Sequence, residues 1–175
     1  MVKRNGQNTL RIHPLYVVDC TIIAQAFAEL GWNKPLGQYM RYFEEQQAGK
    51  RDVRVAWYEQ EFAGYVTVVW DSTYPPFRKE GIPEIVDLNV LSSFRRLGIA
   101  TALLDDAEEL ISQRKDIAGL GVGMTADYGA ALRMYAQRGY LPDGGGLYSH
   151  GQPVKFGEQV PVDDELVLYF KRELG

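Results

Sequence analysis

Apolar residues recur with helical spacing in one long segment that begins after Gly98, and the positions between them are mostly acidic or polar. The spacing predicts an amphipathic helix over residues 97–114. The segment before it, Glu84–Val90, is typical of a strand, so the chain predicts a strand, a tight loop and a long helix in succession. The apolar face of the helix consists of Ala100, Leu103, Leu104, Ala107, Leu110 and Ile111.

The remaining patterns predict helices and strands in a mixed order. Asp19 is a candidate cap for a helix that Gly31 ends, and Val53, Val55 and Trp57 alternate with polar residues ahead of a turn at residues 59–61. We further expect strands over residues 10–13, 62–70, 117–124 and 165–171, helices over 36–47 and 128–137, a loop over 71–83, and an irregular stretch over 142–164 with room for a short hairpin.

The loop between the strand and the long helix is a candidate anion site. Such a joint directs unpaired backbone N–H groups and the positive end of the helix dipole at one spot. Arg95 and Arg96 stand where positive side chains oppose the dipole, so an anion is expected beside them. The alternative is a surface helix whose first turn happens to be basic.

Composition narrows the class of protein. A chain of 175 residues fits one domain over residues 1–175, and its net charge of −4 gives no sign of the basic stripe that nucleic-acid binders carry. No apolar run is long enough to cross a membrane, and residues 1–6 lack the apolar stretch of a secretory signal. The lone Cys20 excludes an internal disulfide and suits the cytoplasm. We therefore expect a cytoplasmic protein that binds neither nucleic acid nor membrane.

Arg95, Gly98 and Ala100 match a motif of Gln or Arg, two residues, Gly, one residue, then Gly or Ala. In this the chain resembles the GCN5-related N-acetyltransferase (GNAT) superfamily. The resemblance continues at Ala131, at Tyr135 and in the Gly-aromatic pair of residues 139–140, and it covers roughly residues 51–142. Tyr128 departs from the pattern, because most members carry Asn there.

The resemblance implies a GNAT-like α/β (α+β) fold, with a mixed, mostly antiparallel sheet of six to seven strands and helices on both faces. It implies acetyl-CoA as co-substrate, a small-molecule or protein amine as acceptor, and a possible homodimer. Main-chain groups of the strand would pair with the pantetheine arm, and a backbone N–H near Val90 would polarise the thioester carbonyl. The implied acetyl-CoA-binding residues are Leu88, Val90, Arg95, Arg96, Leu97, Gly98, Ile99, Ala100 and Thr101.

Two residues are candidates for proton transfer. Glu84 precedes Val90 by six residues and shares its strand parity, and a catalytic glutamate of the histone-acetyltransferase branch has the same spacing to the glycine motif. A carboxylate paired with Arg or Lys is the alternative for Glu84, and Asp87 is the second choice of base. Tyr135 would give a proton to the departing thiolate, and a core tyrosine is the alternative there.

Aromatic residues with an acidic neighbour suit a cationic acceptor. The candidates for acceptor binding are Trp32, Tyr39, Trp70, Asp71, Tyr74 and Asp87, with Tyr148 in the late loop. His13 and His150 show no metal-ligand spacing, so we expect no metal.

Two other functions compete with acetyl transfer. Gly121, Gly123 and Ala126 match a dinucleotide fingerprint, but the match comes late in a short chain rather than at a first strand-helix turn. A non-catalytic acetyl-CoA sensor of the same fold would need the anion loop but neither Glu84 nor Tyr135.

Overall fold

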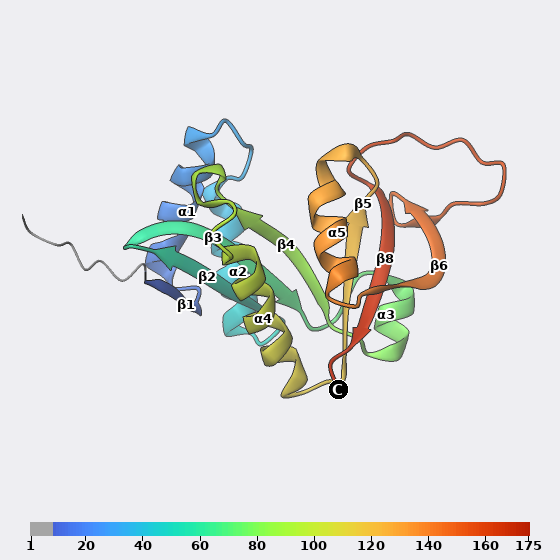
Figure 1. The fold of residues 1–175 in the computed structure, drawn as a ribbon, viewed down its shortest axis with the longest axis horizontal. Coiled ribbons are helices and arrows are strands. Elements are labelled where there is room, and N and C mark those ends of the chain that lie inside the picture. Colours follow the sequence, from blue (N-terminus) through green and yellow to red (C-terminus); the bar gives the residue numbers. More distant parts are fainter. Residues whose placement is uncertain (1–8) are drawn as a thin grey trace, which may run out of the picture. The chain divides into compact units, whose positions relative to one another are not determined.

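The computed structural model describes residues 9–175, which form two compact units (Figure 1). The first unit comprises residues 9–68 and 87–107, and the second comprises residues 69–86 and 108–175. Strand β4 (Glu84–Val90) and helix α4 (Ile99–Ser112) each contribute residues to both units. The hydrogen-bonded strand order is β1-β2-β3-β4-β5-β8-β6-β7.

The first unit contains the antiparallel strands at the β1 end of this sheet. Strand β1 (Leu10–Pro14) pairs with β2 (Arg51–Tyr58), and β2 turns into β3 (Glu61–Val69) through Glu59 and Gln60. Both turn residues have positive φ, 49° and 74°, as a two-residue type I′ hairpin requires.

Helices α1 (Val17–Glu29) and α2 (Leu36–Gln47) cover one face of this part of the sheet. Val53 and Val55 of β2 pack into the core beneath them, whereas Arg54 between these residues points to the other face and pairs with Asp106 of α4. Cys20 of α1 is fully buried, and burial followed by the nearby Asp19 carboxylate raises the pKa of its thiol.

The second unit continues the sheet. The first residues of β4 run parallel to β5 (Ile117–Gly123), and β8 (Leu166–Glu173) lies antiparallel between β5 and β6 (Leu141–Ser149). A two-residue strand, β7 (Gln152–Pro153), closes a hairpin with β6. The unit also holds helices α3 (Pro75–Glu80) and α5 (Gly129–Gln137).

A buried carboxylate ties the second unit together. Glu108 of α4 accepts hydrogen bonds from Arg138 at 2.6 Å, Arg172 at 2.7 Å and Tyr140 at 3.0 Å. Because both guanidinium groups share one carboxylate, the end of α4 is fixed to α5 and β8 by charge-assisted bonds.

The mixed, mostly antiparallel sheet with helices is confirmed, and it has eight strands rather than six to seven. The bounds Leu36–Gln47 and Glu84–Val90 agree with the prediction, as does the short hairpin in residues 142–164. Three predictions are wrong. The stretch over 142–164 is not irregular throughout, because its first residues belong to strand β6. Residues 71–83 contain helix α3, and Asp19 is not the N-cap: Tyr16 is, and the Asp19 side chain accepts a hydrogen bond from the Tyr16 N–H at 2.8 Å.

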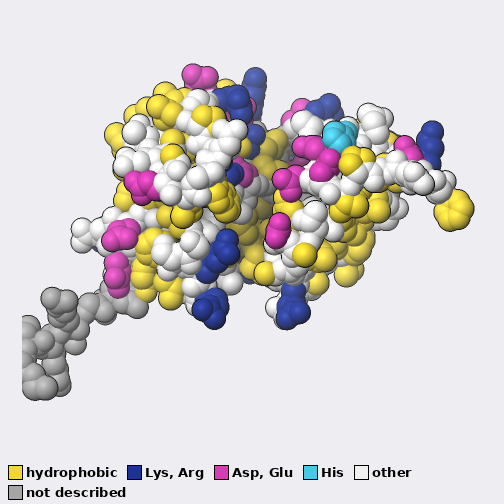
Figure 2. Space-filling model, turned by 90° about the horizontal axis from the view of Figure 1, so that it is seen from above, with side chains coloured by type: hydrophobic (Ala, Val, Ile, Leu, Met, Phe, Trp, Pro, Cys, Tyr) yellow, Lys and Arg dark blue, Asp and Glu magenta, His cyan; other side chains and the backbone are white. Residues whose placement is uncertain are grey.

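Within residues 9–175, no helix is long and apolar enough to cross a membrane. Figure 2 shows acidic and basic side chains interspersed over the face in view.

Candidate functional site

The loop from β4 to α4 forms a backbone cradle in the first unit. Arg96 and Gly98 have positive φ, 62° and 77°, on either side of Leu97. Left-handed residues set between extended or helical ones turn successive N–H groups toward one point, which makes a concave anion site. The first bond into α4 runs from the Ala102 N–H to the Gly98 carbonyl at 3.0 Å. The three amides at residues 99–101 precede it and therefore point out of the helix end.

A surface hollow of about 170 Å³ lies in this cradle. A Cβ added to Gly98 would have no atom within 4 Å, so the hollow is open at the position where an anion would approach the main chain. The Ile99 side chain is buried, so this residue can contribute only its backbone. The hollow is lined by Val90, Phe94, Arg95, Arg96, Gly98, Ile99, Ala100 and Thr101.

The lining agrees largely with the residues implied by the resemblance. Leu88 and Leu97 do not line the hollow, and Leu97 is 48% exposed. Phe94 is an additional lining residue that the motif does not include, and its ring packs edge-on against Tyr58. The hollow is open, the amides at residues 99–101 point out of the helix end, and Arg95 and Arg96 are exposed. These features fit a diphosphate.

Glu84 lies at the start of β4, opposite Gly119 of β5 in the second unit. Its carboxylate is buried and accepts a hydrogen bond from the Ser72 hydroxyl. The argument that Glu84 and Val90 point to the same face of β4 does not hold, because Asp87 between them has a φ of 56°. A left-handed residue interrupts the alternation of side chains along a strand.

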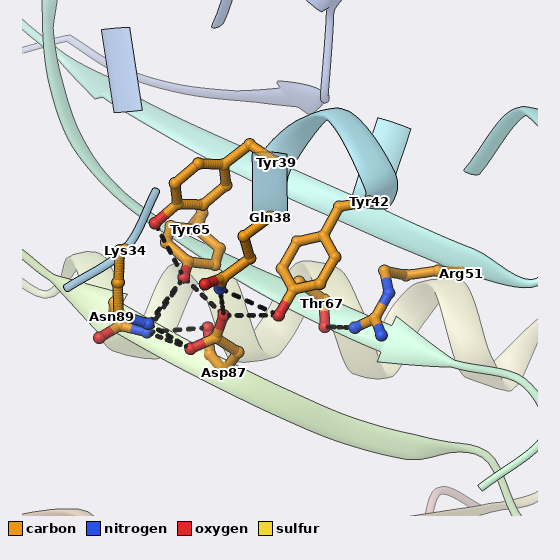
Figure 3. A network of polar contacts seen from close by, with 9 residues as sticks. All are labelled: Lys34, Gln38, Tyr39, Tyr42, Arg51, Tyr65, Thr67, Asp87 and Asn89. Carbon is orange, nitrogen blue, oxygen red and sulfur yellow. Dashed lines mark hydrogen bonds and ion pairs between the residues drawn. The ribbon is translucent and has the colours of Figure 1, made fainter. Parts of the chain in front are cut away.

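Asp87 is the centre of a polar network in the first unit, which joins α2, β3, β4 and the loop after α1 (Figure 3). Burial raises the pKa of Asp87, but the Lys34 ammonium and the hydrogen bonds from Lys34, Tyr65 and Tyr42 outweigh burial and hold the pKa below its usual value. Its carboxylate oxygens accept hydrogen bonds from Lys34 Nζ at 2.7 Å, Tyr65 OH at 2.6 Å, Asn89 Nδ2 at 2.7 Å, Tyr42 OH at 3.1 Å and Gln38 Nε2 at 3.2 Å.

This network has a chemical consequence. A carboxylate with a lowered pKa is a weak proton acceptor and a good partner for a cation. Asp87 is therefore suited to binding rather than to the role of base. Burial, followed by the Asp87 charge, raises the pKa of Tyr42 to about 12, so its hydroxyl stays protonated and donates.

Tyr135 lies on α5 in the second unit and is 8% exposed. Its ring packs edge-on against Tyr140 with centroids 6.0 Å apart, and burial raises its pKa to about 12. The hydroxyl therefore keeps its proton at neutral pH. Tyr128, where the family usually has Asn, packs its ring over Gly123 of β5 and donates to Asp164 at 3.3 Å.

The predicted acceptor residues are divided between the two units, and in the first unit Tyr39 and Asp87 both bond the Tyr65 hydroxyl. In the first unit, Tyr39 is fully buried in the core, whereas Trp32 is 44% exposed. In the second, Asp71 is exposed and pairs with Arg78, and Trp70 lies under the Arg114 guanidinium.

Tyr74 is buried in the second unit, where its ring stacks on Tyr169 with centroids 3.6 Å apart. Its hydroxyl donates to Asp143 at 2.6 Å, and Tyr148 packs edge-on against it. Asp143 and Tyr169 were missed, because they come close to Tyr74 only through strand pairing of distant segments.

Comparisons with known proteins agree with this architecture. The model of the acetyltransferase (GNAT) family matches residues 13–140, whereas a search of curated sequences found no match. The solved N-acetyltransferase of Staphylococcus aureus Mu50 superposes with a TM-score of 0.70 at 17% identity, over 95% of this chain and 99% of that chain.

Two further solved structures are similar. The ribosomal-protein-alanine N-acetyltransferase of Brucella melitensis has a TM-score of 0.70 at 17% identity, over 93% of this chain and 99% of that chain. The yncA protein of Salmonella typhimurium, solved with its cofactor acetyl-CoA, has a TM-score of 0.69 at 16% identity, over 96% and 95%. At these identities the likeness concerns the fold.

Proposed function

Because this chain belongs to the acetyltransferase (GNAT) family, we propose that it moves the acetyl group of acetyl-CoA to a primary amine by direct attack on the thioester. The family uses acetyl-CoA, and the observation that carries the proposal is the open backbone cradle at residues 95–101. We further propose that the acceptor is a small-molecule or protein amine and that the protein works in the cytoplasm as a homodimer.

The bound acetyl-CoA supplies an acetyl group already activated as a thioester. The amides at residues 96–101, together with the guanidinium groups of Arg95 and Arg96 and the Thr101 hydroxyl, would hold its diphosphate. The main chain of Leu88 and Val90 would pair with the pantetheine arm, and an N–H in this segment would stabilise negative charge on the carbonyl oxygen for about 3 kcal/mol.

Two side chains would carry the protons. Glu84, oriented by the Ser72 hydroxyl, would take the proton that the ammonium must lose before it can attack. Tyr135 would give a proton to the departing thiolate, since with a pKa of about 12 its hydroxyl is protonated at neutral pH.

Gly98→Val tests the cradle. A β-branched side chain would fill the open space and could not adopt a φ of 77° without strain, so coenzyme A should no longer bind in a calorimetric titration. Gly157→Val is the matched control, because Gly157 has a φ of 80°, equally open surroundings and no part in the cradle. Equal coenzyme A affinity of the two variants would refute the site.

Release of free thiol with a panel of amines separates transfer from binding alone. Thiol release that depends on an amine supports transfer. Coenzyme A binding without thiol release on any amine would instead favour the non-catalytic acetyl-CoA sensor.

A further inference from the structure

The Lys34 ammonium lies in a complete cation site made by other residues of the first unit. Its Nζ is 2.7 Å from the Asp87 carboxylate and 3.1 Å from the Tyr65 hydroxyl (Figure 3). The same atom is 5.5 Å from the centre of the Phe27 ring and 5.6 Å from that of Tyr65. A carboxylate, a phenol hydroxyl and an aromatic ring are groups by which proteins recognise an alkylammonium.

Asp87 does not need Lys34 to satisfy its hydrogen bonding. One oxygen, Oδ2, accepts from Tyr65, Tyr42 and Gln38, and the other, Oδ1, accepts from Asn89 as well as Lys34. Lys34 therefore supplies mainly the compensating charge. A different ammonium could supply the same charge without leaving the carboxylate short of donors.

Lys34 also belongs to a segment that reaches the surface. It lies between α1 and α2, where its neighbours Trp32 and Leu36 are 44% and 43% exposed. Lys34 lines a surface hollow of about 410 Å³ together with Trp32 and residues of α1. The same residue thus lines the hollow and bonds the Asp87 carboxylate.

The site lies on the strand that the donor would use. Asp87 is three residues before Val90, which lines the cradle, so the two are about 10 Å apart along β4. A pantetheine arm that extends from the cradle back along β4 would bring its reactive end to the Asp87 region.

We propose that Asp87, Tyr65 and Phe27 form the binding site for a cationic nitrogen of the acceptor, and that Lys34 occupies this site until the acceptor displaces it. The inference rests on the proposed function. A nitrogen held by the Asp87 carboxylate, as the Lys34 ammonium is at 2.7 Å, is bound in its protonated form and has no lone pair for attack. The acceptor therefore carries a second nitrogen that reacts, which makes it a diamine or a polyamine.

Binding of 1,4-diaminobutane without acetyl-CoA tests this inference. In Lys34→Met, which keeps the methylene contacts and removes the charge, the diamine should shift the NMR signal of the Asn89 side-chain amide. The apparent Kd should be about fivefold to tenfold lower than in the wild type, because no internal competitor remains. Lys50→Met, a change at an exposed lysine after α2, should leave the wild-type Kd unaltered.

An Asn89 signal that does not respond to the diamine in folded Lys34→Met, or an equal Kd in the variant and the wild type, would overturn the inference. If Lys34→Met does not melt cooperatively, the test is made on the wild-type protein labelled with 15N-lysine. A large molar excess of diamine should then displace the Lys34 ammonium from Asp87 and change its NMR signal. A Lys34 signal that does not change would overturn the inference. Because acetyl-CoA is absent, these results are independent of thiol release, which tests acetyl transfer itself.

Discussion

Gly64→Ala should displace β4 and weaken both the fold and coenzyme A binding. A Cβ at Gly64 would lie 2.4 Å from the Asn89 carbonyl oxygen and 3.0 Å from the Val90 Cα. Ordinary contact begins near 3.4 Å, so β3 and β4 would have to separate by about 1 Å at this point. Both obstacles are main chain, which cannot move aside as a flexible side chain could.

Overpacking of this kind costs about 1–3 kcal/mol, which for a chain of this length lowers Tm by about 2–12 °C. The displaced residues include Val90 of the cradle, and loss of one main-chain hydrogen bond to the pantetheine arm would weaken coenzyme A binding about fivefold. Circular dichroism melts measure the first effect, and calorimetric titration with coenzyme A measures the second.

Gly37→Ala is the matched control. Gly37 lies in the first turn of α2, where an added Cβ meets nothing within 4 Å, so the same substitution should stabilise the fold by about 0.5 kcal/mol. Should Gly64→Ala melt at or above the wild-type temperature, the close approach of β3 and β4 would be refuted.

Two further predictions concern the polar residues. Glu84→Gln and Tyr135→Phe should each lower kcat about 100-fold or more while the Kd for coenzyme A stays unchanged, as steady-state kinetics and calorimetry would reveal; an unaltered kcat removes the residue from the mechanism. Asp87→Asn should lower the free energy of unfolding at pH 7 by about 1–3 kcal/mol, because it removes the charge paired with Lys34 and replaces one of the two acceptor oxygens by an amide donor that faces buried donors. The folded-state pKa of Asp87 lies below the unfolded value of about 3.9, so this stabilisation is complete above that pH and is lost as the pH falls through the folded-state pKa. Chemical denaturation of both proteins from pH 7 to pH 2 should therefore show the difference shrinking below about pH 4, and a constant difference would contradict it.

Helices and strands whose bounds depend on neighbouring residues alone can be predicted from local patterns in the sequence. Helix α2 and strand β4 have the expected bounds because their periodicity and flanking residues agree. The backbone cradle was predictable for the same reason, since a glycine at a strand-helix joint indicates a left-handed turn ahead of the helix. Helix α3 was missed because Pro75 and Pro76 are typical of a loop, although proline also fits the first turn of a helix and Gly81 provides a left-handed end.

The cation site could not be predicted, because it depends on contacts between distant segments. Lys34 and Asp87 are separated by 53 residues, and neither has a distinctive local motif. The left-handed conformation of Asp87 is also invisible, since the sequence of β4 gives no sign of where the alternation breaks. Parity arguments hold only while every residue of a strand stays extended.

The burial of Cys20 makes the chemistry of this protein easy to follow with a thiol-reactive dye. It is the only cysteine of the chain, it is fully buried, and its thiol donates to the Tyr39 carbonyl at 3.5 Å. The raised pKa further suppresses the thiolate that a disulfide reagent attacks. While the fold is intact, the colour that develops in a continuous assay therefore comes from liberated coenzyme A, and a slow rise in the blank would report unfolding of helix α1.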